Sequence, residues 1–181
     1  MGARTLRLPV ITTIEYKGMC FIIMDSPTKS TVPYFVEECQ RLRVSDIVRV
    51  CEDRYPTDRF EEAGIHVHHW EFCDGSPPPD QILNNWFKLL RDRFYGEGVS
   101  GDAPKTSIAP GPVAVHCVAG YGRAPVLVAV ALMELGMPCE DAVELIRSKR
   151  KGAFNDRQLL YLTNYHASAR LRRHIRHCFL V

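Results

Sequence analysis

The sequence lacks any apolar run long enough to cross a membrane. Its most apolar stretch, APVLVAVALMEL (124–135), is shorter than the roughly 20 residues that a spanning helix needs, and it contains Glu134. The opening residues, MGARTLRLPVITT, hold no apolar segment of the length found in secretory signal peptides. Leu6 also stands where a myristoylation pattern requires Ser or Thr. We therefore expect neither a membrane-spanning segment nor a lipid at the amino terminus.

The sequence also has little net charge: it contains 23 Lys and Arg residues and 21 Asp and Glu residues, which gives +2. No overall positive field therefore argues for a nucleic-acid partner. The charge is uneven, however: residues 169–181, ARLRRHIRHCFLV, carry four arginines and no acid. With no internal repeat or linker in the sequence, we expect one domain over residues 1–169, followed by a basic tail at 170–181.

The seven cysteines are odd in number, and no signal peptide precedes them. We therefore expect a reducing, intracellular setting, in which cysteines act as buried apolar residues, nucleophiles or redox pairs. His66, His68 and His69 lie near Cys73, but their spacing matches no standard zinc pattern, and we predict a strand surface there. We predict neither a metal nor a cofactor.

Short apolar runs alternate with longer amphipathic segments along the chain. The runs bounded by turn residues are predicted strands, at 19–25, 45–51, 64–72 and 112–117. Segments with helical spacing of apolar residues are predicted helices, at 31–42, within 76–96, and at 123–135, 138–150 and 155–170. This order predicts an α/β fold with a central, mainly parallel sheet flanked by helices. We assign no catalytic role to the polar loop at 97–111, which leads into the last strand.

Residues 116–123, HCVAGYGR, fit the pattern H-C-x-x-G-x-x-R between a predicted strand and a predicted helix. A helix start has partial positive charge and unpaired N–H groups, which favours a reactive thiolate at Cys117. The predicted anion cradle comprises Val118, Ala119, Gly120, Tyr121, Gly122 and Arg123. The guanidinium of Arg123 can clamp two oxygens of a tetrahedral anion. This pattern predicts phosphoryl transfer through a cysteinyl-phosphate, against the alternative of a buried cysteine at a glycine-rich turn.

Asp74 lies in the segment WEFCDG (70–75), just past another predicted strand. When a phosphate ester is cleaved the leaving oxygen needs a proton, which a carboxylic acid on a loop can supply. Cys51, Asp74 and Cys117 all lie at or past strand ends, where ligands bind in parallel sheets. We predict that Asp74 is the general acid; the alternative is an ordinary Asp-Gly turn.

The chain resembles the phosphatases of regenerating liver, a prenylated branch of the dual-specificity protein tyrosine phosphatases. The residues that carry the resemblance are HCVAGYGRAPVLVAVAL, EDAVELIRSKRKGAFNDRQLLYL, GIHVHHWEFCDGSPPP and the terminal C-a-a-X. It implies a nucleophile at Cys117, a phosphate-binding arginine at Arg123, a general acid at Asp74, and a phosphoprotein substrate. It also suggests that Asn155 and Gln158 help to place the hydrolytic water.

Ala124 follows Arg123 where most related phosphatases have Ser or Thr, whose hydroxyl helps the thiolate to leave. We therefore predict slow turnover and a long-lived phosphoenzyme. The resemblance supports an alternative: a phosphatase fold that binds CBS-domain magnesium-transport mediators, with Cys117 phosphorylation as the switch. A phosphoinositide phosphatase ranks lower because VAGYGRA lacks lysine. The resemblance leaves a homo-oligomer open.

The resemblance also implies a reversible disulfide between Cys51 and Cys117, which would protect the thiolate from overoxidation. The alternative is that Cys51 is simply a buried cysteine at a strand end. Glu71 and Cys73 depart from the family stretch, which has a proline and an acid at these places. Cys73 could therefore compete with Cys51 as the resolving thiol.

The chain ends in Cys178-Phe179-Leu180-Val181 after a basic cluster. A terminal C-a-a-X with upstream arginines predicts prenylation of Cys178 and attachment to an anionic membrane surface. We expect the prenylated chain, methylated at its end, on the cytoplasmic face of the plasma membrane and endomembranes, and the unmodified chain in the cytoplasm. Val181 does not decide between farnesyl and geranylgeranyl, and a chance cysteine after a basic helix is the alternative.

Overall fold

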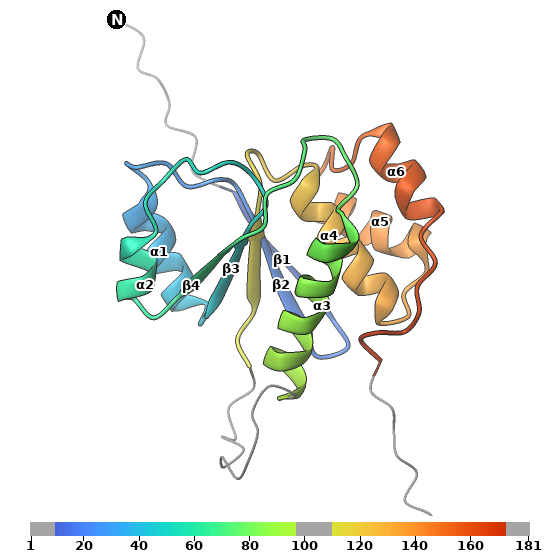
Figure 1. Cartoon of the computed structure of the whole chain (residues 1–181), viewed down its shortest axis with the longest axis horizontal. Coiled ribbons are helices and arrows are strands. Elements are labelled where there is room, and N and C mark those ends of the chain that lie inside the picture. Colours follow the sequence, from blue (N-terminus) through green and yellow to red (C-terminus); the bar gives the residue numbers. More distant parts are fainter. Residues whose placement is uncertain (1–9, 97–109, 173–181) are drawn as a thin grey trace, which may run out of the picture.

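Five strands form one sheet in the order β1-β2-β5-β3-β4 (Figure 1). The computed structural model describes residues 10–96 and 110–172. The strands are β1 (Ile11–Tyr16), β2 (Met19–Met24), β3 (Asp46–Arg49), β4 (His66–His69) and β5 (Val113–His116). Only β1 pairs antiparallel with its neighbour, while β2, β5, β3 and β4 run parallel. The predicted α/β class with a mainly parallel sheet is therefore confirmed.

Helices cover both faces of this sheet (Figure 1). One face carries α1 (Val32–Arg41) and α2 (Asp58–Glu62); the other carries α3 (Asp80–Tyr95), α4 (Arg123–Glu134), α5 (Cys139–Lys149) and α6 (Asp156–Thr163). Alternate residues of β2 enter two separate cores, Phe21 and Ile23 on the α4 side and Ile22 and Met24 on the α1 side. Burial on both faces explains why this strand is a continuous apolar run rather than an alternating one.

The helix α4 lies at the centre of the larger core, and every residue from Arg123 to Glu134 is buried. A helix that is apolar on all sides needs partners on all sides, and α4 packs against α3, α5, α6 and the sheet. Trp86 of α3 adds a specific contact, because its indole Nε1 donates a hydrogen bond of 2.9 Å to the carbonyl of Leu127. This hydrogen bond joins α3 to the first half of α4.

The strand β1 and the short helix α2 lie outside the elements predicted from the sequence. A two-residue turn joins β1 to β2, with φ values of 47° at Lys17 and 81° at Gly18. Positive φ at both central residues is the hairpin geometry that matches the twist of paired strands. Because β1 is an edge strand with only alternate residues buried, its apolar signal is weak.

The predicted helix at 155–170 is wrong beyond Thr163, where α6 ends. The fully buried carboxylate of Glu134 accepts hydrogen bonds from the Tyr165 hydroxyl (2.6 Å) and from the Ser168 and Arg170 backbone N–H groups (3.3 and 2.7 Å). These bonds hold the segment after α6 in an irregular path over the end of α4. Leu171 is fully buried, so packing reaches past residue 169 into the predicted tail.

The remaining tail residues, 173–181, and the loop at 97–109 lie outside the described residues. Cys178 and its predicted lipid are therefore not placed. Among the residues that the structure does describe, no helix is both long and apolar enough for a membrane span.

Candidate active site

The loop at 118–122 connects the end of β5 to the start of α4, with Cys117 directly after the strand and Arg123 as the first helical residue. Cys117 and Arg123 are 4% and 3% exposed. The sequence pattern therefore lies where it was predicted, in a strand–loop–helix unit at the carboxyl ends of the parallel strands.

Three carbonyl groups of this loop are held by neighbours outside it. Ser26 N donates to Val118 O (3.0 Å), the Arg150 guanidinium to Ala119 O (2.9 Å), and Phe154 N to Tyr121 O (2.7 Å). In a trans peptide the C=O and the following N–H point in opposite directions. The N–H groups of residues 119, 120 and 122 therefore point away from these partners, as an anion cradle requires.

Arg123 is fixed on one side by backbone carbonyls. Its Nη1 donates to Phe72 O at 3.0 Å and to Val50 O at 3.3 Å. Its buried Nε has no hydrogen-bond partner among the described residues. Because this charged N–H makes no hydrogen bond in the structure, it is available to an anionic oxygen of a ligand.

Asp74 and Glu52 bring two carboxylates to the same guanidinium. Asp74 Oδ1 lies 3.2 Å from Arg123 Nε, in an ion pair whose angle is not that of a hydrogen bond, and also accepts from Gly75 N at 3.0 Å. Glu52 Oε2 lies 3.9 Å from Arg123 Nη2. The Asp74 side chain is 81% exposed, so solvent and a substrate can reach it. The structure thus brings Cys117, Arg123 and Asp74 to one site.

His116 and Tyr55 form a buried pair beneath the loop that the sequence did not reveal. Tyr55 Oη lies 2.7 Å from His116 Nε2, and His116 Nδ1 lies 3.0 Å from the carbonyl oxygen of Cys117. Because a carbonyl can only accept, Nδ1 carries the proton and Nε2 accepts from the tyrosine. Burial lowers the pKa of His116 to about 4, so the ring is neutral and orients the backbone at Cys117.

A cleft of about 240 Å³ opens beside the loop, between Asp74, Tyr121, Phe154 and Gln158. Gln158 and Asn155 bond each other reciprocally at the start of α6, through Gln158 N to Asn155 Oδ1 (2.8 Å) and Asn155 N to Gln158 Oε1 (3.1 Å). The buried Gln158 Nε2 has no hydrogen-bond partner among the described residues. It therefore offers a second donor beside the loop, next to Gly122.

Cys51 and Cys73 differ sharply in their surroundings. Cys51 is fully buried and Cys73 is exposed, and both are free thiols, as is Cys117. Burial raises the pKa of Cys51 to about 11, against the lowering effect of Arg123, and the charge of Cys117 raises it further. Val50 N, one residue before Cys51, donates to the carbonyl of His116 at 3.0 Å, so Cys51 lies beside the start of the loop, as the predicted position at a strand end requires.

The three histidines of β4 each face a carboxylate. His66 lies 3.5 Å from Glu61, His68 lies 2.9 Å from Asp46 and His69 lies 3.5 Å from Glu71. Within residues 10–96 and 110–172, no three His, Cys, Asp or Glu side chains are grouped as a metal ion would need. All three histidines are exposed or half-buried on β4, as predicted for a strand surface.

Comparison with known proteins gives the same assignment as the geometry. A family model described as protein-tyrosine phosphatase matches residues 34–168. Mouse protein tyrosine phosphatase type IVA 2 is 49% identical over 165 residues, covering 91% of this chain and 92% of the relative. The chain belongs to the protein tyrosine phosphatase type IVA (PRL) family. The resemblance noted in the sequence is thus confirmed.

Further type IVA relatives and a solved structure agree with this assignment. The PRL-1 phosphatase of Drosophila melanogaster is 46% identical over 172 residues, or 95% of this chain and 91% of its own. A putative protein tyrosine phosphatase from Leishmania major has a TM-score of 0.76 and 39% identity, covering 86% of this chain and 98% of that one. The chain is therefore a Cys-based protein tyrosine phosphatase of the dual-specificity type.

Proposed function

We propose that this type IVA phosphatase hydrolyses phosphotyrosine, and phosphoserine or phosphothreonine less readily, at the membrane surface through a slowly cleared cysteinyl-phosphate. The observation that supports it most is the buried Arg123 Nε, which has no hydrogen-bond partner among the described residues. The loop before it supplies the N–H groups of residues 119, 120 and 122, which point away from the partners of the loop carbonyls. Together these donors match the equatorial oxygens of a phosphoryl group. The aromatic rings of Tyr121 and Phe154 at the cleft favour an aromatic leaving group.

In the first step the Cys117 thiolate attacks phosphorus while the P–O bond to the substrate breaks. The protonated Asp74 carboxyl gives its proton to the leaving oxygen, so that a neutral hydroxyl departs. In the second step water attacks phosphorus, the Asp74 carboxylate takes a proton from it, and the P–S bond breaks to return the thiolate. Gln158 Nε2 is placed to donate to the incoming water or to a phosphate oxygen.

Slow turnover follows from Ala124, which is fully buried in the first turn of α4 and has no hydroxyl to stabilise the departing thiolate. The same feature favours a second candidate function. A phosphoenzyme that persists can act as a switch for a protein partner, such as the CBS-domain magnesium-transport mediators suggested by the family resemblance.

The path of the chain supports a protein substrate over a phosphoinositide. The last described residue, Arg172, lies near the end of α4 that is opposite Arg123, and the 12 residues of α4 span about 18 Å. The tail that would carry a lipid on Cys178 therefore begins at the end remote from the cleft. The basic tail and a prenyl group would supply the two membrane signals that stable attachment needs.

Kinetics of Cys117→Ser and Asp74→Ala variants on phosphotyrosine peptides and on phosphoinositides would test the proposal. We expect Cys117→Ser to abolish turnover and Asp74→Ala to lower it by about 10²- to 10⁴-fold on phosphopeptides. Asn85→Ala, at a half-buried position of α3 outside the cleft lining, is a matched control. Full activity of Asp74→Ala, or faster hydrolysis of phosphoinositides than of phosphopeptides, would contradict it. Turnover near background with tight binding of a CBS-domain protein would favour the second candidate.

A further inference from the structure

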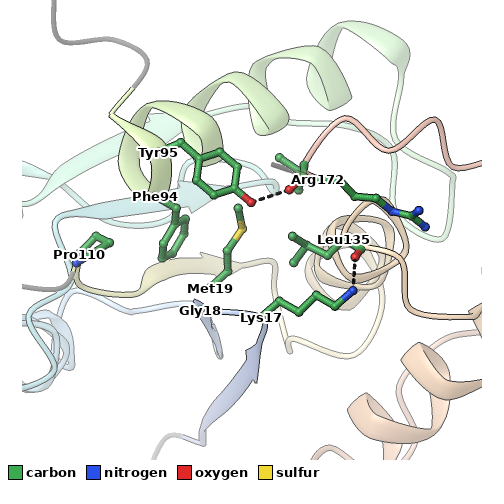
Figure 2. A pocket seen from close by; sticks show the side chains of 9 residues that line it. Lys17, Gly18, Met19, Phe94, Tyr95, Pro110, Leu135 and Arg172 are labelled. Atoms are coloured by element: carbon green, nitrogen blue, oxygen red, sulfur yellow. Dashed lines mark hydrogen bonds between the residues drawn. The ribbon is translucent and has the colours of Figure 1, made fainter. Parts of the chain in front are cut away.

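A cavity of about 610 Å³ lies at the end of the sheet opposite the catalytic loop (Figure 2). Its walls include Met19 at the start of β2, Phe94 at the end of α3, and Leu135 just after α4. Each of these elements reaches the cavity with the end that is remote from Cys117. The cavity is thus separate from the active site, and its volume is within the 300–1,000 Å³ typical of small-molecule pockets.

Hydrogen bonds to backbone carbonyls hold the walls in place. Tyr95 Oη donates to Leu171 O at 2.5 Å, and Lys17 Nζ donates to Leu135 O at 3.0 Å, as Figure 2 shows. Both side chains direct a polar end to the backbone and present an aromatic ring or an aliphatic chain beside the cavity. The cavity is therefore preformed and suited to a hydrocarbon ligand.

The C-terminal segment forms part of this same wall. Leu171 and Arg172 both line the cavity, and the Glu134 carboxylate holds the preceding residues over α4. Gly136, with φ of 99°, makes room for Arg172, because a Cβ at this glycine would lie 2.7 Å from Arg172 Nη2. The point at which the tail leaves the domain is thus fixed at the cavity.

Six residues of sequence lead from Arg172 to Cys178, the cysteine of the terminal C-a-a-X. Six residues span at most about 20 Å when extended, so a group on Cys178 stays within reach of the cavity. An isoprenyl chain is a long, branched hydrocarbon that is costly to expose to water. The tail is short, it starts at the cavity wall, and the cavity is lined by apolar groups. These three features together indicate that an isoprenyl chain on Cys178 is the occupant.

We propose that this cavity binds the isoprenyl chain on Cys178 when the enzyme is away from a membrane. The proposal rests on the prenylation of Cys178 in the proposed function. The prenylated chain then exchanges between a form with its lipid in the cavity and a form with its lipid in the bilayer. Since both forms leave the cleft at the other end of the sheet open, the exchange changes location and not access to the active site.

The binding step can be tested without lipidating the protein. The full chain with Cys178→Ser, labelled at the methionine methyl groups, would be titrated with N-acetyl-S-farnesyl-cysteine methyl ester and followed by NMR. We expect a saturable shift of the Met19 signal, while Met24, at the catalytic end of the same strand, stays unchanged. N-acetyl-cysteine methyl ester, without the farnesyl chain, should shift neither. A Met19 signal that does not move, or that moves together with Met24, would overturn the proposal.

The exchange can be measured on the prenylated chain with neutral phosphatidylcholine vesicles, which remove the contribution of the basic tail. Phe94→Glu places a charge at the cavity and should raise the vesicle-bound fraction at least threefold. Gln81→Glu adds the same charge at an exposed site at the other end of α3 and should leave it unchanged. Equal vesicle binding by Phe94→Glu and wild type would refute the proposal, and circular dichroism would show whether the variant folds.

Failure of the proposed function would be seen separately. Mass spectrometry of the chain purified from eukaryotic cells shows whether Cys178 is prenylated, and an unmodified Cys178 would refute membrane attachment by this route. The NMR titration would still decide whether the cavity takes an isoprenyl chain. Phosphopeptide kinetics, which depend on the opposite end of the sheet, decide the catalytic part independently.

Discussion

The guanidinium of Arg150 donates a hydrogen bond of 2.9 Å to the carbonyl oxygen of Ala119, which lies 31 residues earlier in the catalytic loop. The same guanidinium forms an ion pair with Asp25 and stacks on the ring of Tyr121, 5.0 Å from its centroid. Gly120 permits this approach, because a Cβ there would lie 2.4 Å from Arg150 Nη2. A residue outside the H-C-x-x-G-x-x-R pattern thus positions the loop.

Replacing Arg150 with lysine should lower kcat/KM about 10- to 100-fold. A single ammonium cannot reach Asp25, Ala119 and the Thr12 hydroxyl together, and misplacement of the loop by about 1 Å is enough for such a loss. Steady-state kinetics on a phosphotyrosine peptide, with vanadate binding measured by calorimetry, would show both effects. Arg150→Ala should in addition cost about 1–3 kcal/mol of unfolding free energy, because it leaves the Ala119 carbonyl and the Thr12 hydroxyl without this donor.

The neighbouring exposed residue provides the control for this prediction. Lys151→Ala removes a positive charge one position further along and should leave both kinetics and stability close to wild type. If Arg150→Lys retained full kcat/KM and normal vanadate affinity, a positioning role for Arg150 would be ruled out.

The central part of the fold and the positions of the proposed site residues could be predicted from the sequence because their signals are local. The apolar run of β5 continues into a glycine-rich loop and a helix that is apolar on all sides, and this order alone places Cys117 and Arg123 together. The position of Asp74 near Arg123 could be predicted because Asp74 comes after a strand, and the carboxyl ends of parallel strands share one edge of the sheet.

Arg150, Tyr55 and His116 could not be assigned their roles from the sequence, because the contacts that join Arg150 to the loop and Tyr55 to His116 are between residues distant along the chain. Arg150 lies in a basic stretch, KRKG, that looks like a solvated surface, and only tertiary contacts show that this arginine is buried. The end of α6 was missed for a similar reason. The carboxylate that redirects the chain after Thr163 belongs to Glu134, about 30 residues away.

Ala124→Ser should speed breakdown of the phosphoenzyme by about 10-fold or more. A hydroxyl in the first turn of α4 can donate to the departing thiolate, and hydrogen bonds to charged groups contribute about 1.5–3 kcal/mol. Single-turnover kinetics with rapid quench would measure decay of the cysteinyl-phosphate separately from its formation. Ala129→Ser, a buried alanine in the middle of the same helix, controls for burying a hydroxyl and should not change this rate. Equal decay rates in Ala124→Ser and wild type would refute the explanation of slow turnover.

Mild peroxide should link Cys51 to Cys117, and dithiothreitol should restore activity. Cys51 is buried beside the loop and interacts electrostatically with Cys117 and Arg123, whereas Cys73 is exposed. Peptide mapping by mass spectrometry would identify the bridge in wild type and in Cys73→Ser, while Cys51→Ser should be inactivated irreversibly. A Cys73–Cys117 bridge in wild type would show instead that Cys73 is the resolving thiol.

The rate of this bridge formation should depend strongly on pH. Burial raises the pKa of Cys51 to about 11, so only a small fraction is thiolate near neutral pH. Because the thiolate is the attacking species, the rate should rise about tenfold per pH unit between pH 7 and 9. Stopped-flow oxidation, with peroxide raised until the rate no longer depends on its concentration, would isolate the attack of Cys51 and measure its rate. A rate that is flat over this range would mean that Cys51 is not the attacking group.

The stability of the domain should fall as the pH drops from about 6.5 to 4, because His116 is buried in its neutral form. Burial lowers its pKa in the folded chain to about 4, against about 6.5 when unfolded. Within this window the unfolded chain binds a proton that the folded chain does not, so up to about 3 kcal/mol of stability is lost on acidification. Burial raises the pKa of the Asp46 carboxyl, but hydrogen bonds from His68 and Ser45 and the charge of Arg93 bring this pKa below its usual value. Asp46 therefore adds to the loss of stability only at a pH below the window in which His116 acts.

Urea unfolding at several pH values would test this, with His116→Gln as the comparison. The variant keeps the other six histidines, so their contributions to the pH dependence are shared with wild type. We expect the wild-type free energy of unfolding to fall more steeply between pH 6.5 and 4 than that of His116→Gln, whatever their absolute difference at neutral pH. Parallel curves across this window would show that His116 takes up its proton as readily in the folded chain as in the unfolded one. The Tyr55–His116–Cys117 hydrogen bonds would then not depend on a neutral imidazole.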